Sequence, residues 1–157
     1  MGAGEYVASL DADMIPEKHL LRALLPHLVI NPKMAMAGCP QAFFNVPSGD
    51  PLNQDLRHFF ETLEPIKDRA GLAWCTGSGF VMRRQALDDI GGFPTGTLAE
   101  DVCCSSLMIG LGWQTCFVNE LLQWGTVPES LAGHLKQRTR WTIGTIQSAI
   151  KMQVSQP

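Results

Sequence analysis

The sequence predicts one α/β domain with a mainly parallel sheet. Short β-prone runs alternate with segments in which apolar residues recur at helical spacing, as expected for strands joined by helices. The chain has 157 residues, of which 45% are hydrophobic and 17% charged, so it can bury a core of substantial size. It shows no internal repeat and no linker long enough to divide it.

The first half of the chain predicts two strands, each followed by a helix. Residues 6–10 form a β-prone run. Pro16 then opens a helix with leucines at helical spacing, and Asn31-Pro32 stops it. Residues 34–38 predict a buried strand. After the Pro- and Gly-containing loop 46–51, a helix of about 18 residues with one apolar face is expected.

The second half continues the alternation. Residues 79–82 predict a strand, and residues 85–90 a short helix that a pair of glycines ends. Glu100 opens the next helix, because acids are favoured in a first turn. Residues 114–118 predict another strand, and residues 128–152 predict one or two helices.

Composition excludes several classes of protein. The net charge of −3 leaves no basic surface of the kind that binds nucleic acid. Five cysteines, an odd number without a C-x-x-C pair, predict free thiols in place of disulfides or a zinc site. The longest uncharged stretch, 102–119, is too polar for a membrane span and predicts a helix followed by a strand.

The first candidate for chemistry is Asp11-Ala12-Asp13, directly after the first strand. Side chains two residues apart on a strand point to the same side, so the two carboxylates can share Mg²⁺ or Mn²⁺, which in turn holds a diphosphate. Ligands of open α/β sheets bind beyond the carboxyl ends of strands, where this pair lies. Taken alone, such a pair is more often a solvated turn between a strand and a helix.

The second candidate is Glu100-Asp101 at a predicted helix start. A carboxylate there can serve as a general base whose pKa depends on partly dry surroundings, or it can simply complement the helix dipole. The third candidate is Gln137-Arg138-Thr139-Arg140-Trp141. On a helix, Gln137, Arg140 and Trp141 share one face, which suits a phosphate and a stacked sugar ring, or else an amphipathic helix with an anchoring Trp.

The order of the three motifs resembles the processive family 2 glycosyltransferases of the cellulose-synthase-like group. Their signature runs D-x-D, T-E-D and Q-x-x-R-W at about this spacing, and the resemblance extends from Leu10 to about Gln147. Smaller matches follow the same order: Gln41-Ala42-Phe43-Phe44-Asn45, the Gly-Ser strand Thr76–Arg84 and Gly91-Gly92-Phe93-Pro94. Ala99 replaces the usual Thr before Glu-Asp, and Cys75-Thr76 replaces the usual Phe-Cys before Gly-Ser.

The resemblance implies the fold of a nucleotide-diphospho-sugar transferase, which is Rossmann-like, and an inverting transfer of a sugar from a UDP-sugar donor. UDP-glucose is the expected donor, and a growing β-glycan the expected acceptor. Asp101 is expected to take the proton of the acceptor hydroxyl, and Asp11 and Asp13 to hold the metal ion. Arg140, with Arg138 or Gln137, is expected to bind the donor diphosphate. The expected acceptor contacts are Trp141, Glu100, Gly77 and Ser78.

The family's first nucleotide-binding half would precede Asp11, where only ten residues stand. The sequence therefore predicts, over residues 1–157, the C-terminal part of a catalytic domain. It also predicts a longer, multi-pass membrane parent that holds this segment on the cytoplasmic side. Three alternatives stay open: a non-processive family 2 transferase, a non-catalytic module that binds a nucleotide or a glycan, and an α/β scaffold in which the motifs coincide by chance.

Overall fold

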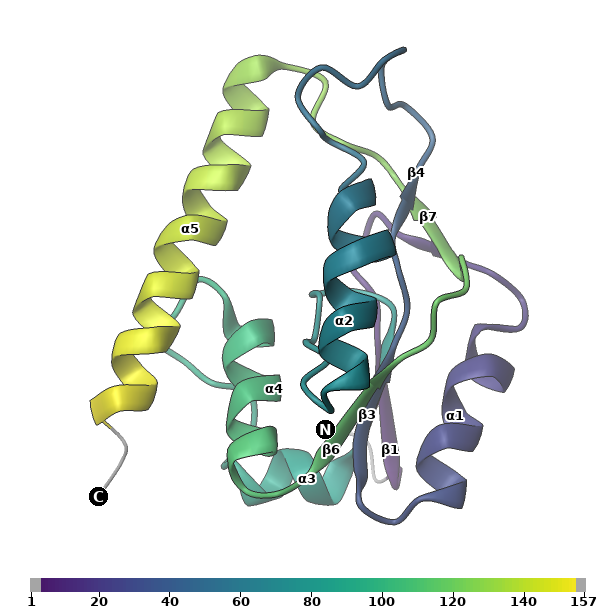
Figure 1. Cartoon of the computed structure of the whole chain (residues 1–157), viewed down its shortest axis with the longest axis vertical. Coiled ribbons are helices and arrows are strands. Elements are labelled where there is room, and N and C mark those ends of the chain that lie inside the picture. The colour runs from purple at the N-terminus through teal and green to yellow at the C-terminus, as the bar shows by residue number, and fades with distance from the viewer. Residues whose placement is uncertain (1–3, 155–157) are drawn as a thin grey trace.

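The computed structural model describes residues 4–154, and its centre is a four-stranded sheet (Figure 1). The strands lie in the order β1-β5-β3-β6. Their bounds are Tyr6–Ser9 for β1, Phe80–Arg83 for β5, Met34–Gly38 for β3 and Gln114–Phe117 for β6. All four coincide closely with strands that the sequence predicts.

Strand direction corrects one part of the prediction. β3 and β6 are parallel, but β5 is antiparallel to both of its neighbours, β1 and β3. Three strands therefore run the same way, as expected, while β5 is reversed and two of the three strand pairs are antiparallel. The cause is the connection, because the chain leaves β3 and enters β5 at the same edge of the sheet, where Gly38 is paired with Phe80.

A second, three-stranded sheet was not predicted. It has the order β2-β7-β4 and consists of Ile15–Pro16, Gln123–Gly125 and Ala42–Phe43. Pro16 lies in its edge strand β2, the position in a sheet that tolerates a residue without an N–H. The prediction that Pro16 opens a helix is therefore wrong, and the first helix, α1, starts later and spans Leu20–Ile30.

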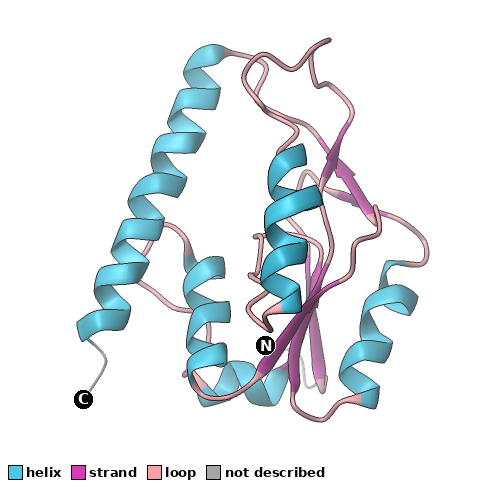
Figure 2. Cartoon of the chain, viewed as in Figure 1, coloured by secondary structure: helices cyan, strands magenta, loops and turns pink. Residues whose placement is uncertain are grey.

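Helices cover both faces of the main sheet (Figure 2). Leu20, Leu24 and Leu28 of α1 pack on one face, against Ala37 and Val81. On the other face lie α3 and α4, which span Arg84–Asp89 and Glu100–Gly110. The last helix, α5, spans Leu131–Val154 and runs along the outer side of α4 (Figure 1). Strand β3 is buried on both sides, which explains its uninterrupted apolar sequence.

The helix expected after the loop 46–51 is shorter than predicted. It consists of a π-helical turn, η1, over Phe59–Leu63, which continues into α2 over Glu64–Arg69. Residues 44–56 form instead a long loop beside the N-terminal end of α5 (Figure 1). Among residues 4–154, none of the helices has the length and apolarity that a membrane crossing requires.

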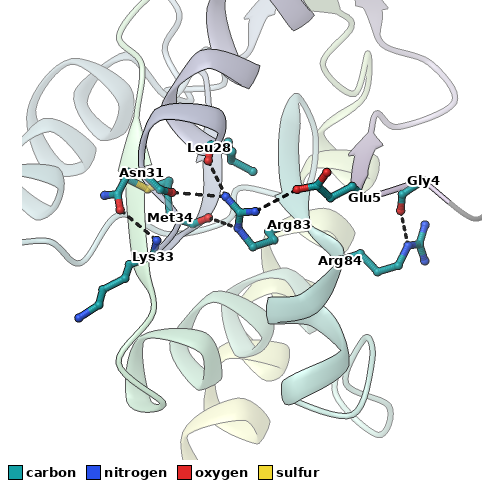
Figure 3. Close-up of polar contacts among 8 residues, drawn as sticks. All are labelled: Gly4, Glu5, Leu28, Asn31, Lys33, Met34, Arg83 and Arg84. Atoms are coloured by element: carbon teal, nitrogen blue, oxygen red, sulfur yellow. Dashed lines mark hydrogen bonds and ion pairs between the residues drawn. The ribbon is translucent and has the colours of Figure 1, made fainter.

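The end of β5 ties three elements together (Figure 3). The Arg83 guanidinium donates to the carbonyl oxygens of Leu28 and Asn31 at the end of α1, and to the carbonyl of Met34 in β3 at 3.2 Å. It also pairs with the Glu5 carboxylate, 3.4 Å away, next to β1. The neighbouring Arg84 donates to the Gly4 carbonyl (Figure 3). Because β5 is reversed, Arg83 and Arg84 lie at the opposite edge of the sheet from Gly77, and their contacts hold the sheet to α1 and to the residues before β1.

Candidate active site

One cleft, of about 380 Å³, collects all three sequence motifs. It lies beyond the carboxyl ends of β1 and β3, at the edge where the reversed β5 begins. Nine of the ten predicted site residues line it: Asp11, Asp13, Gly77, Glu100, Asp101, Gln137, Arg138, Arg140 and Trp141. The first five are called the acidic wall below, and the last four the α5 wall.

Asp11 and Asp13 leave the end of β1 with exposed side chains. A turn follows at once, since the Met14 N–H donates to the Asp11 carbonyl at 3.0 Å. Partial burial of the Asp11 carboxylate raises its pKa above the ordinary value of 3.8, the Asp13 charge raises it further, and Arg140 opposes the shift. Arg140 therefore acts on Asp11 across the cleft, although no direct ion pair joins them.

Ser78, the tenth predicted residue, does not line the cleft. Its side chain is fully buried, and its hydroxyl accepts from the Asp11 backbone N–H at 3.1 Å and donates to the side-chain oxygen Oε1 of Gln123 at 2.7 Å. The expectation that Ser78 contacts the acceptor is corrected accordingly. Ser78 instead holds the backbone of Asp11, and so fixes the position from which the Asp11 side chain enters the cleft.

Gln123 completes this buried network. Its side-chain amide donates to the carbonyls of Ser78 at 3.1 Å and Pro40 at 3.4 Å, so one side chain joins the ends of β3, β5 and β7. Gly79, with φ of +69°, lies directly against this amide, where a Cβ would overlap it. Fully satisfied buried networks of this kind hold one geometry, because every alternative leaves a polar group unpaired.

Asp101 sits in the first turn of α4 and accepts from the Val102 N–H at 2.8 Å. Gly77 lies against it, since a Cβ built on Gly77 would be 3.1 Å from the Asp101 Oδ2. Gly77 also has φ of +88°, which disfavours any side chain there. Burial raises the pKa of Asp101 above 3.8, and the charges of Glu100 and Asp11 raise it further against the Val102 hydrogen bond.

Helix α5 packs closely against the residues that precede α4, and this contact connects the two walls of the cleft. Gly144 packs on the segment before Glu100, where a Cβ would be 2.8 Å from the Ala99 Cβ. The Thr97 hydroxyl donates to the Gly144 carbonyl at 3.0 Å, and the Ser148 hydroxyl donates to the Ala99 carbonyl at 3.2 Å. This seam sets the position of the Q-x-x-R-W residues relative to Glu100 and Asp101.

The two arginines of the α5 wall are placed differently. Arg140 is exposed in the cleft. Arg138 is half-buried, donates to the Asn53 carbonyl at 3.2 Å, and lies over the Trp141 ring with its guanidinium carbon 4.5 Å from the ring centroid. Both arginines were expected to bind the diphosphate, because a helical repeat shows which residues share a face but not what they contact.

Several cleft residues were not predicted from the sequence. Trp74 is held by its neighbours, since its backbone N–H donates to the buried Glu64 carboxylate at 3.0 Å and the Lys67 ammonium lies 3.1 Å from its ring centroid. A partial signal for this cluster was available, because Glu64 and Lys67 stand three residues apart, a spacing that brings their side chains together on a helix. Further unpredicted lining comes from the long loop and the segments on either side of it, namely Gln41, Phe43, Gln54, Leu56, Phe59 and Phe60.

The acidic wall fits a metal ion that is shared with a substrate. Within residues 4–154, no group of three or more His, Cys, Asp or Glu side chains converges as a complete metal site. Asp11 and Asp13 offer two exposed carboxylates, and Mg²⁺ is commonly held by one or two carboxylates together with substrate phosphates. The donor set therefore fits a hard divalent cation that also binds a diphosphate.

Comparisons with known proteins agree with this geometry. The model of the family described as glycosyltransferase like family 2 matches residues 1–144. Cellulose synthase 1 of Komagataeibacter xylinus is 30% identical over 154 residues, which cover 92% of this chain and 10% of the relative. The UDP-forming cellulose synthase catalytic subunit of Pseudomonas fluorescens is 32% identical, with 92% and 20% covered. The chain thus spans about a tenth to a fifth of the length of these relatives.

A solved structure shows the same fold. The mannosyltransferase of Pyrobaculum calidifontis, in complex with GDP-Man and Mn²⁺, superposes with a TM-score of 0.74 over 99% of this chain and 41% of its own. At 22% identity, this likeness speaks for the fold alone. The nucleotide-diphospho-sugar transferase fold that the motifs predict is therefore confirmed, as is the cellulose-synthase-like resemblance. The chain belongs to the glycosyltransferase-like family 2.

Proposed function

We propose that this domain transfers glucose from UDP-glucose to the growing end of a β-glycan, with inversion at the sugar carbon. The observation that carries the proposal is the convergence of D-x-D, Glu100-Asp101 and Q-x-x-R-W in one cleft, although 90 residues separate Asp11 from Asp101. The names of the curated relatives, cellulose synthases described as UDP-forming, support both the donor and the type of acceptor.

Asp101 is the general base of the proposed reaction. The acceptor hydroxyl attacks the anomeric carbon, the bond from that carbon to the UDP oxygen breaks, and the hydroxyl proton passes to the Asp101 carboxylate. The leaving UDP takes the electron pair of the broken bond, so the α-linked donor gives a β-linked product. The raised pKa of Asp101 favours this role, because a base with a pKa nearer the working pH holds the proton better.

The donor diphosphate is bound between the two walls. Asp11 and Asp13 would hold Mg²⁺ or Mn²⁺, which supplies positive charge to the diphosphate when it is bound. Arg140 is exposed in the cleft and acts electrostatically on Asp11, so it is placed to bind the same diphosphate, with Gln137 beside it. A guanidinium suits this role because its fork of N–H donors matches two phosphate oxygens.

The acceptor is bound by Trp141, Glu100 and the backbone at Gly77. A half-buried indole in the cleft offers a flat apolar surface for a sugar ring, and Gly77 leaves room beside the base. We also propose that the full-length protein is a multi-pass membrane enzyme that holds this domain on the cytoplasmic side, which the cellulose-synthase resemblance supports.

The test is sugar transfer by the full-length protein in membranes. UDP release and incorporation of labelled glucose are measured with UDP-glucose and Mg²⁺, and the polymer is digested with a β-glucan-specific hydrolase. Excess chelator should abolish both signals, and Mg²⁺ or Mn²⁺ should restore them. A parallel panel with UDP-N-acetylglucosamine and GDP-mannose identifies the sugar, and a clear preference for either would overturn the glucose assignment. Full activity in excess chelator would refute the proposal that transfer requires a divalent metal ion.

A further inference from the structure

We propose that Arg138 is a positioning residue that fastens the loop 46–56 to α5 and fixes the Trp141 indole, and that it does not bind the donor diphosphate. The inference rests on the proposed function, since it divides the work of the α5 wall between donor and acceptor. It assigns Arg138, together with the loop, to the acceptor side, and it leaves Arg140 as the arginine of the donor side.

Two contacts already engage the Arg138 guanidinium. Its Nη2 donates to the Asn53 carbonyl at 3.2 Å, and its central carbon lies 4.5 Å from the centroid of the Trp141 ring. A guanidinium held by a carbonyl and by an aromatic ring has little freedom to turn toward a ligand. The same two contacts restrain the indole, because Trp141 then has the guanidinium packed against its ring.

The charged groups near the two arginines also place Arg138 with the loop and Arg140 with the acidic wall. Burial lowers the pKa of Arg138, and the carboxylate that acts against this shift is Asp50, in the loop. Arg140 is the cation that lowers the pKa of Asp11, at the start of the acidic wall. Arg138 is thus coupled to the loop, while Arg140 is coupled to the proposed metal and diphosphate site.

The loop 46–56 needs such a fastening because its backbone is locally strained. Asp50, Asn53 and Leu56 have φ values of +35°, +50° and +55°, a region that residues with side chains occupy at a cost. The Asp50 carboxylate offsets part of this cost by accepting the N–H groups of Gln54 at 2.7 Å and Asp55 at 3.0 Å. The Arg138 contact falls on Asn53, between two of the strained positions.

The loop also shapes the cleft, so its position has consequences for binding. Gln54 and Leu56 line the cleft together with Trp141. Gln54 is buried and donates to the Pro128 carbonyl at 2.9 Å, just before α5 begins. Releasing the loop from α5 would therefore move two lining residues and loosen the indole, on the part of the cleft proposed for the acceptor.

The test compares four variants of the full-length protein: Arg138→Ala, Arg138→Lys, Asp50→Ala and Arg140→Ala. The KM for UDP-glucose and the KM for a short β-glucan acceptor are measured for each. Arg138→Ala and Asp50→Ala should both raise the acceptor KM by about tenfold and change the donor KM by less than about twofold, since each acts through the loop. Arg140→Ala should do the reverse. Arg138→Lys should recover part of the acceptor binding, because an ammonium still reaches the Asn53 carbonyl.

A second readout does not depend on activity. Hydrogen exchange of residues 46–56 is followed in the 157-residue chain and its variants. Arg138→Ala should speed the exchange of the Gln54 and Asp55 amides several-fold, and Arg140→Ala should leave it unchanged. An equal rise in donor KM for both arginine variants, with unchanged loop exchange, would overturn the inference. If the wild type transfers no sugar while the loop still loosens only in Arg138→Ala and Asp50→Ala, the proposed function fails and the fastening role stands.

Discussion

The two walls of the cleft are held in place by different means. The acidic wall rests on buried groups: Ser78 and Gln123 are fully enclosed, and the hydrogen bonds of Gln123 join β7 of the small sheet to Ser78 before β5 and to Pro40 after β3. The α5 wall is held in part by the buried seam at Gly144, but the segment that carries Arg138 and Trp141 is joined to the loop 46–56 by an exposed contact between Arg138 and Asn53. A buried network leaves one favourable arrangement, whereas exposed contacts exchange readily with water.

The difference matches the roles proposed for Asp11, Asp13 and Asp101 in the acidic wall and for Trp141 in the α5 wall. Groups that remove a proton and hold a metal ion must keep their geometry to within about an ångström, which favours a preorganised support. Groups that hold a sugar chain must let successive residues of that chain pass, which favours an adjustable one. The predictions below test this contrast by changing one support at a time.

The largest effect is expected for Asp101→Asn, in the acidic wall. Asparagine keeps an oxygen for the Val102 N–H but cannot accept the acceptor proton. Loss of a general base typically costs about 10²–10⁴-fold, so sugar transfer should fall by that factor while UDP binding is retained. The measurements are initial rates and UDP titrations of the full-length protein. Turnover near the wild-type rate would remove the base assignment.

The next effect concerns the seam between the walls. In Gly144→Ala the new methyl group would lie 2.8 Å from the Ala99 Cβ, so α5 must move away from the segment before Glu100. Overpacking of this kind costs about 1–3 kcal/mol, which urea unfolding of the chain would measure. Gly110→Ala is the matched control, since Gly110 ends a helix with nothing within 4 Å of the added Cβ. It should be neutral or slightly stabilising, and an equal loss in both variants would contradict the seam.

Much of the fold and site follows from local sequence patterns. The four main strands, the helices α1, α4 and α5, and the motif residues of the cleft could all be predicted. Each depends on hydrophobic periodicity or on a motif whose residues are adjacent in the chain. The walls meet because strand ends and helix starts converge at one edge of an α/β sheet.

The remainder depends on contacts between residues far apart in the sequence. The reversal of β5 depends on where the chain re-enters the sheet, and the small sheet pairs Ile15 with Trp124. The burial of Ser78 depends on Gln123, 45 residues further along. Arg138 and Arg140 differ because Asn53 and Asp50 of the loop lie near Arg138, while Arg140 acts on Asp11. No periodic pattern in the sequence carries this information.

A smaller effect is expected for Gln123→Leu, which tests the support of the acidic wall. The change leaves the carbonyls of Ser78 and Pro40 without their buried donor. Unpaired buried polar groups cost about 1–3 kcal/mol, so unfolding in urea should shift by that amount. Mn²⁺ affinity, followed by its electron paramagnetic resonance signal, should also weaken, because Ser78 holds Asp11. Gln85→Leu serves as control, because the Gln85 side chain is exposed and its hydrogen bond to Asp89 can be replaced by water, so both quantities should change little.

The smallest effect is a gain in the thermal stability of Asp101→Asn, the same variant that should lose activity. Because burial raises the pKa of Asp101, the folded chain binds a proton more tightly than the unfolded chain, whose pKa is near 3.8. Between 3.8 and the raised value the folded state holds more protons, so the stability that this group contributes is complete below 3.8 and falls as pH rises through the folded pKa. At pH 7 the ionised Asp101 is therefore a net cost to the fold.

Asp101→Asn should accordingly have a higher Tm than the wild type at pH 7, and the difference should vanish as pH falls below 3.8, where Asp101 is neutral in both states. Asp88→Asn, on the exposed end of α3, controls for removal of one negative charge from a chain of net charge −3. If Asp101→Asn were less stable than the wild type at pH 7 while the Asp88 control was unchanged, the hydrogen bond from the Val102 N–H would stabilise the ionised carboxylate by more than burial destabilises it. The ionised Asp101 carboxylate would then stabilise the acidic wall at pH 7 instead of destabilising it.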